Sequence, residues 1–131
     1  MEFILRLVAV VGAAAHVIFF FKEALKWDVS FVQMAAPSWV ERVGGRDKAI
    51  PYVTWAAGLA FNVGTYNLVL AVGLAWVAIA GSDVASTLGI FLAIWLLGAA
   101  AAACYTKVKP AFYVQGALGV ILLIVALAAR A

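Results

Sequence analysis

Residues 3–27 read FILRLVAVVGAAAHVIFFFKEALKW, and this stretch decides the fold class. It is apolar throughout except for Arg6, His16 and a few charged residues near its end. A helix crosses the hydrocarbon core of a bilayer with about 20 residues. The stretch is therefore long enough to span a membrane. Because its apolar run continues well past the length of a signal-peptide core, we expect an uncleaved membrane helix.

The rest of the chain has the same composition. Of its 131 residues, 68% are apolar and only 11% are charged, whereas soluble domains are nearer half apolar and a quarter charged. We therefore expect one domain over residues 1–131, with membrane lipids as its surroundings and partners. The formal net charge of +3 does not indicate nucleic acid, because the basic residues lie at the ends of apolar segments and form no stripe.

Four segments are long and apolar enough to span. The helices that we predict cover residues 3–27, 52–80, 84–106 and 110–129. The short connections between the last three force antiparallel neighbours, so the sequence predicts an all-α, integral membrane, up-down four-helix bundle. Pro51 is suited to the first turn of the second helix. Residues 28–50 mix apolar and charged side chains, which fits either a short amphipathic piece in the interface, ended by Gly44 and Gly45, or a solvated loop.

The basic residues predict an orientation. Seven of the nine lie in or beside two connections: Lys22, Lys26, Arg42, Arg46, Lys48, Lys107 and Lys109. Positive residues are enriched in cytoplasmic loops. We expect a multi-pass protein of the plasma (inner) membrane, with loops 28–50 and 107–109 in the cytoplasm and both termini outside.

Two ionisable residues stand out in the first helix. In a regular α-helix, the seven residues from His16 to Glu23 turn by about 700°, so both side chains leave from one face, about 10 Å apart along the axis. Ionisable groups inside a membrane are costly and usually face a cavity or pathway. We predict that His16 acts as a catalytic acid or base and that Glu23 is its electrostatic partner, with a water, an ion or a polar head group between them.

Polar and aromatic residues of the other helices complete a predicted chamber that opens to the cytoplasm. Asn62 is level with His16 on the floor, while Gln115 and Tyr105 lie at the mouth beside Glu23. The candidate ligand-binding residues are Asn62, Tyr66, Asn67, Gln115, Tyr105 and Trp95, although Asn67 is expected to point elsewhere. Each amide could instead simply bridge two helices. One histidine and one glutamate are too few ligands for a metal site, and no cofactor can be assigned.

Small residues fill one part of the third predicted helix. The run GAAAAAC (98–104) begins at Gly98, ends at Cys104 and lets helix backbones approach closely. Packing within the bundle is the favoured interpretation, and contact between two copies in a homo-oligomer is the alternative.

Three segments resemble a known family. They are AHVIFFFKEALKW (15–27), FNVGTYNLVLAVGLAW (61–76) and FYVQGALGVILLIVAL (112–127). They are similar to motifs of short bacterial four-helix membrane proteins catalogued as a domain of unknown function, number thirteen-zero-four. The resemblance implies nine marked positions: His16, Glu23, Trp27, Asn62, Gly64, Tyr66, Asn67, Gln115 and Gly116. It implies no reaction.

Three functions fit these observations. The favoured hypothesis is a membrane protein that binds or converts a small lipid-like or isoprenoid-like molecule, whose head group enters the chamber from the cytoplasmic leaflet. The alternatives are a small proton-coupled dimeric transporter that uses Glu23, and an accessory subunit of a larger membrane complex. Transport is less favoured because alternating access prefers a site near the midplane.

Overall fold

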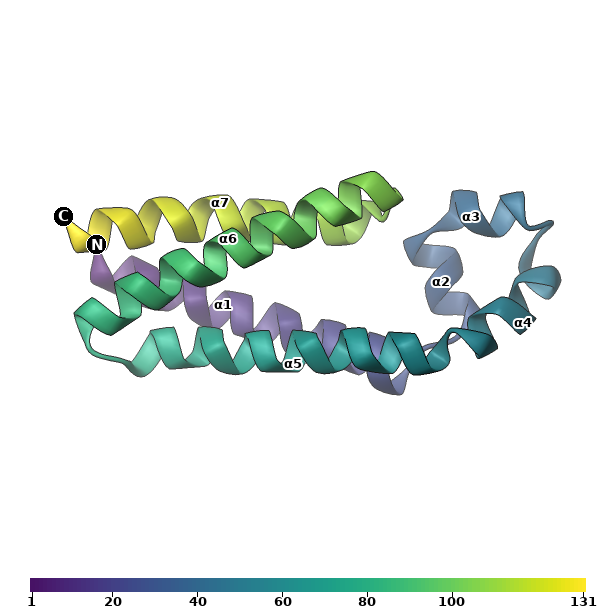
Figure 1. The fold of residues 1–131 in the computed structure, drawn as a ribbon, viewed down its shortest axis with the longest axis horizontal. Helices are drawn as coiled ribbons and strands as arrows, with labels where there is room; N and C mark the ends of the chain where they lie inside the picture. Colours follow the sequence, from purple (N-terminus) through teal and green to yellow (C-terminus); the bar gives the residue numbers. More distant parts are fainter.

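The computed structural model describes residues 1–131, and the chain is all-α. The helices in chain order are α1 (Glu2–Phe20), the π-helix η1 (Phe21–Leu25), α2 (Val29–Ala35), α3 (Pro37–Arg42), α4 (Arg46–Trp55), α5 (Ala57–Ile79), α6 (Ser82–Thr106) and α7 (Lys109–Arg130). The long helices run along the length of the molecule, and α2, α3 and α4 project beyond one end (Figure 1). The predicted all-α fold is confirmed.

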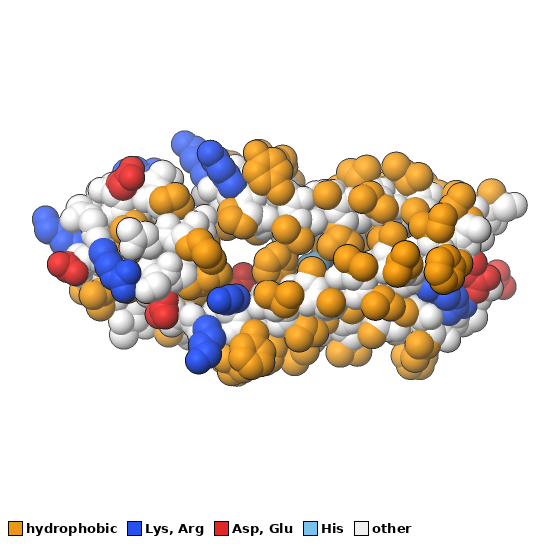
Figure 2. Space-filling view, turned by 180° about the vertical axis from the view of Figure 1, so that it is seen from behind, with side chains coloured by type: hydrophobic (Ala, Val, Ile, Leu, Met, Phe, Trp, Pro, Cys, Tyr) orange, Lys and Arg blue, Asp and Glu red, His pale blue; other side chains and the backbone are white.

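Four elements can cross a membrane. They are the continuous segment Glu2–Leu25 and the helices α5, α6 and α7, each with 22 to 25 residues and a strongly apolar composition. Figure 2 shows hydrophobic side chains covering the visible face of the four spans, while charged side chains gather toward the two ends of the molecule. The protein is therefore a multi-pass membrane protein.

The four spans alternate in direction. Helix α1 packs mainly against α5, and α6 packs mainly against α7. Figure 1 shows both termini at one end, together with the α5–α6 turn. The α6–α7 turn and the α2–α4 projection lie at the other end.

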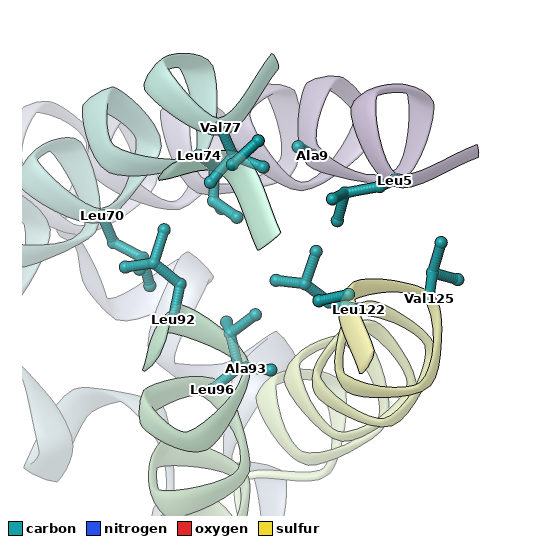
Figure 3. Packing of buried hydrophobic residues seen from close by; sticks show 12 residues of the cluster. Leu5, Ala9, Leu70, Leu74, Val77, Leu92, Ala93, Leu96, Leu122 and Val125 are labelled. Atoms are coloured by element: carbon teal, nitrogen blue, oxygen red, sulfur yellow. The ribbon is translucent and has the colours of Figure 1, made fainter. Parts of the chain in front are cut away.

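The main hydrophobic core lies in the half of the molecule near the termini (Figure 3). All four spans contribute to it: Leu5, Ala9, Leu70, Leu74, Val77, Ala85, Leu92, Ala93, Leu96, Leu122, Val125 and Ala126. Arg6 links α1 to α5 at the end of the molecule near the termini. Its guanidinium donates to the carbonyls of Ala78 and Ala80 at 2.6 and 2.8 Å. The last carbonyls of a helix have no partner within it. Arg6 thus supplies hydrogen-bond donors to carbonyls at the end of α5 and holds this end against α1.

The connection 28–50 is helical and packs on itself. Asp28 begins α2 by accepting a hydrogen bond from the backbone N–H of Phe31 at 2.8 Å. Gly44 and Gly45 both have φ of +96°, a conformation that favours glycine, and they follow the end of α3 as expected. A second core cluster then forms from Val32, Val40, Ala49 and Val53. The segment is therefore folded into short helices around a small core of its own.

Two predicted helix boundaries differ from the structure. Pro51 lies inside α4 rather than in a first turn, because the helix already starts at Arg46, directly after the Gly45 turn. Proline there leaves the carbonyl four residues earlier without its helical N–H, and the exposed position of Pro51 makes this tolerable. The predicted helix 52–80 is in fact the end of α4 followed by α5, with a break at Ala56.

Candidate functional site

The end of the first span changes from α-helix to π-helix. The change covers Phe21–Leu25 and places Glu23 at its centre. A π-turn bonds i to i+5, holds more residues per turn than an α-helix, and is frequent at functional sites. The angle between His16 and Glu23 therefore departs from that of a regular α-helix. The sequence gives no signal for this change.

Glu23 pairs with an amide of α5. Oε2 of Glu23 accepts a hydrogen bond from Nδ2 of Asn67 at 2.6 Å, and Asn67 is only 8% exposed. Contrary to the expectation that Asn67 points elsewhere, it is the side chain that meets the carboxylate. Asn62, expected to face the chamber, is exposed on another face of α5.

The close packing at Gly64 explains why Asn67 is the residue of α5 that bonds to Glu23. A Cβ built on Gly64 would lie 2.8 Å from the backbone nitrogen of Ala24, so only a residue without a side chain lets α5 pack this closely on η1. Residues three apart share a helix face. Asn67 therefore follows Gly64 onto the side that faces Glu23. The spacing of Gly64 and Asn67 in the sequence is the signal that could have revealed this contact.

An apolar cavity of about 300 Å³ adjoins the Glu23–Asn67 pair. Glu23 is the only ionisable residue in its wall; the others are Trp27, Phe31, Val32, Ala35, Ala36, Ala56, Leu59, Ala60, Val63 and Val108. The cavity lies where the α2–α4 projection meets the spans, and Figure 2 shows the surface hollowed in this region. Nε1 of Trp27 donates to the carbonyl of Val53 at 2.9 Å, which fixes one wall against α4.

His16 lies outside this cavity. The ring is fully buried, its Nδ1 is 2.8 Å from the carbonyl oxygen of Gly12, and its edge meets the ring of Phe19 at 5.5 Å between centroids. Because the Gly12 carbonyl can only accept, Nδ1 carries a proton, and in a neutral ring Nε2 is then an acceptor. Nε2 has no partner within the protein. His16 and Glu23 therefore do not share this cavity.

The remaining predicted site residues are dispersed. Gln115 is partly buried and Tyr105 is 89% exposed, and neither lines the Glu23 cavity. Tyr66 and Trp95 come together elsewhere, on an apolar cavity of about 220 Å³ between α5 and α6. The structure thus brings together Glu23 and Asn67 from the predicted set, and separately Tyr66 and Trp95. No group of three or more His, Cys, Asp or Glu residues comes close enough to hold a metal ion.

The fold and this site define a class: a helical multi-pass membrane protein with a carboxylate–amide pair beside an apolar cavity in its spanning region. The family model described as "Protein of unknown function (DUF1304)" matches residues 10–127. The chain belongs to this family, and the resemblance seen in the three motifs is confirmed. The matched range includes Glu23, Gly64 and Asn67. No curated protein and no solved structure matches the sequence.

Proposed function

We propose that the protein binds a small lipid-like molecule in the Glu23 cavity. The apolar part of the ligand lies against side chains such as Trp27, Leu59 and Val63, and its polar end contacts the Glu23 carboxylate. The observation that supports this is the composition of the wall, ten uncharged residues and one carboxylate. Sites for small molecules are mostly apolar, with a few polar groups that set orientation.

The carboxylate restricts the polar end of the ligand. Asn67 already occupies Oε2 of Glu23, so Oε1 is available to accept a further hydrogen bond. A carboxylate in apolar surroundings is costly unless it is paired. A hydroxyl or an amine supplies the missing donor. Long-chain or isoprenoid alcohols and amines are therefore the ligands that fit best.

The volume restricts the rest of the ligand. About 300 Å³ is at the lower end of the range of about 300–1,000 Å³ for small-molecule sites. The cavity therefore accommodates a head group and the first part of a chain, and a longer tail would extend into the bilayer.

Binding is better supported than chemical conversion or transport. Conversion by the predicted pair requires His16 beside Glu23, and the buried imidazole does not line the cavity. For transport, a site near the midplane is preferred, whereas Glu23 stands two residues before the end of the span Glu2–Leu25.

The test compares the molecules that co-purify with matched variants. Wild-type protein, Glu23→Gln, Leu59→Trp and Glu41→Gln are purified in the same mild detergent and extracted for lipid mass spectrometry. Glu41 is an exposed carboxylate of α3 that does not line the cavity, so Glu41→Gln is the charge-matched control. We expect one alcohol or amine enriched in the wild type and in Glu41→Gln, and lost when Leu59→Trp fills the cavity or Glu23→Gln weakens the acceptor. If the amount of this alcohol or amine is equal in all four samples, the proposal is wrong.

The proposal includes an orientation, with the α2–α4 projection and the α6–α7 turn in the cytoplasm of the plasma membrane. It is supported by the gathering of seven of the nine basic residues at this end. Cys104 is the only cysteine, is exposed, and lies at the same end of α6. A membrane-impermeant thiol reagent should label it in inside-out vesicles and leave it unlabelled in intact cells. The reverse pattern contradicts the orientation.

A further inference from the structure

A larger cavity, of about 580 Å³, lies between the α2–α3 connection and the α6–α7 turn. Its wall consists of Met34, Ala35, Pro37, Ser38, Ala103, Cys104, Lys107, Lys109, Pro110 and Phe112. It shares only Ala35 with the wall of the Glu23 cavity. The two cavities therefore have separate chemistry, one with a carboxylate and one with two ammonium groups.

The charged groups around the larger cavity are mostly basic. Lys107 also borders an adjoining hollow whose wall includes Ser38, Glu41 and Arg42. Three cations thus face one carboxylate in this region, and neither lysine forms an ion pair within the protein. An anion placed in the cavity would meet uncompensated positive charge.

The backbone at Lys107 gives an independent observation. Lys107 has φ of +62° and is the only non-glycine residue of the chain with a positive φ. It ends α6, where its N–H bonds to the carbonyl of Cys104 and the next N–H bonds to that of Ala103. Glycine is the usual residue in such a helix end. A strained backbone is often found at functional positions, and here the strained residue carries an ammonium group in the cavity wall.

We propose that this cavity binds the phosphate group of an anionic lipid. Lys107 and Lys109 contact the phosphate, and Met34 and Phe112 contact the first carbons of the acyl chains. Both lysines lie at the end of membrane-spanning helices, the depth at which lipid phosphates occur. The site does not depend on the ligand proposed for Glu23, since no charged residue is common to the two walls.

Binding titrations of the full chain in detergent test this site, with dioleoyl phosphatidic acid as the probe and native mass spectrometry as the readout. Dioleoyl phosphatidylcholine and inorganic phosphate are titrated in parallel. The variants are Lys107→Gly, Lys109→Gln and, as the matched control, Lys48→Gln at the same end of the molecule. Lys107→Gly suits the positive φ, so a loss of binding in it does not come from a strained fold.

We expect phosphatidic acid to bind more tightly than phosphatidylcholine, and each cavity variant to weaken it about fivefold. That factor corresponds to about 1 kcal/mol per basic residue near a lipid surface. Lys48→Gln should change the affinity less than twofold. An equal loss in Lys48→Gln indicates general surface attraction and overturns the site. Lysine-dependent binding of inorganic phosphate as tight as that of phosphatidic acid overturns the assignment to a lipid.

Discussion

The side-chain amide of Asn67 donates a 2.6 Å hydrogen bond to Glu23, which lies 44 residues earlier in the chain. This bond joins α5 to the π-turn η1 at the edge of an otherwise apolar cavity. A buried charged or polar group that loses its partner is destabilising, whereas loss of both partners can be nearly neutral. The effects on stability of substitutions at Glu23 and at Asn67 should therefore be coupled.

Replacement of Asn67 by leucine should lower the free energy of unfolding by about 1–3 kcal/mol, because Glu23 then has no donor within the protein. Unfolding of the purified protein in mixed micelles by increasing amounts of SDS measures this change. In the double variant Glu23→Leu with Asn67→Leu, most of the stability should return. Additive losses in the double variant would show that the two side chains do not interact.

Gly64 should tolerate no side chain. In Gly64→Ala the new methyl would lie 2.8 Å from the backbone nitrogen of Ala24, so α5 and η1 must separate. Overpacking of this kind destabilises by about 1–3 kcal/mol. Gly58→Ala is the matched control in the same helix, because its Cβ meets nothing within 4 Å and alanine should stabilise the helix by up to about 1 kcal/mol. Equal effects of the two substitutions would contradict the close approach at Gly64.

The spans could be predicted from the sequence because each is a long apolar run, and lipid leaves the backbone of such a run no alternative to a helix or a closed barrel. The ends of the spans were harder to predict. Nothing in the residues around Pro51 shows that α4 already begins at Arg46, because the two glycines before it permit either a loop or a new helix. Helical structure in residues 28–50 is accompanied by packing among Val32, Val40, Ala49 and Val53, which come from three different helices, α2, α3 and α4.

The candidate site could be predicted only in part. Glu23 is conspicuous in the sequence because an acidic residue in a span is unusual, and in the structure it lines a cavity. Its partner could not be found by matching depths along ideal helices, since this method pairs Glu23 with Gln115 and His16 with Asn62. The π-turn changes the direction in which Glu23 leaves its helix, and the close approach at Gly64 brings that face of α5 against it. Asn67 on this face, rather than Gln115, is therefore the hydrogen-bond partner of Glu23.

Arg6 should be a main support of the end near the termini. In Arg6→Ala the carbonyls of Ala78 and Ala80 lose their guanidinium donors, and Glu2 loses its ion pair. We expect a loss of about 1.5 kcal/mol, the lower end for hydrogen bonds to a charged group, because the Arg6 side chain is partly exposed. Arg6→Lys should recover only part of this loss, since an ammonium group lacks the planar fork of Arg6.

The same SDS unfolding assay checks the contribution of Arg6. Arg130→Ala is its control, because Arg130 is exposed at the same end and forms no side-chain hydrogen bond. A loss in Arg130→Ala as large as that in Arg6→Ala would mean that charge at this end matters and that the two carbonyl contacts do not.

His16 should be dispensable for ligand binding and for stability. Its Nε2 atom is fully buried without a partner, which costs about 1–3 kcal/mol, whereas its Nδ1–H bonds to a Gly12 carbonyl that lies within α1. His16→Leu removes the unpaired nitrogen and keeps an apolar side chain in the core. We expect the free energy of unfolding to stay the same or to rise by about 1 kcal/mol. The molecule that co-purifies with the wild type should still be bound, because His16 does not line the Glu23 cavity.

Val17→Leu, at an exposed neighbouring position, is the control for substitution in α1. If His16→Leu loses more than about 2 kcal/mol, Nε2 has a buried partner such as a water molecule. If it keeps its stability and loses the ligand, His16 and Glu23 act on one molecule after all.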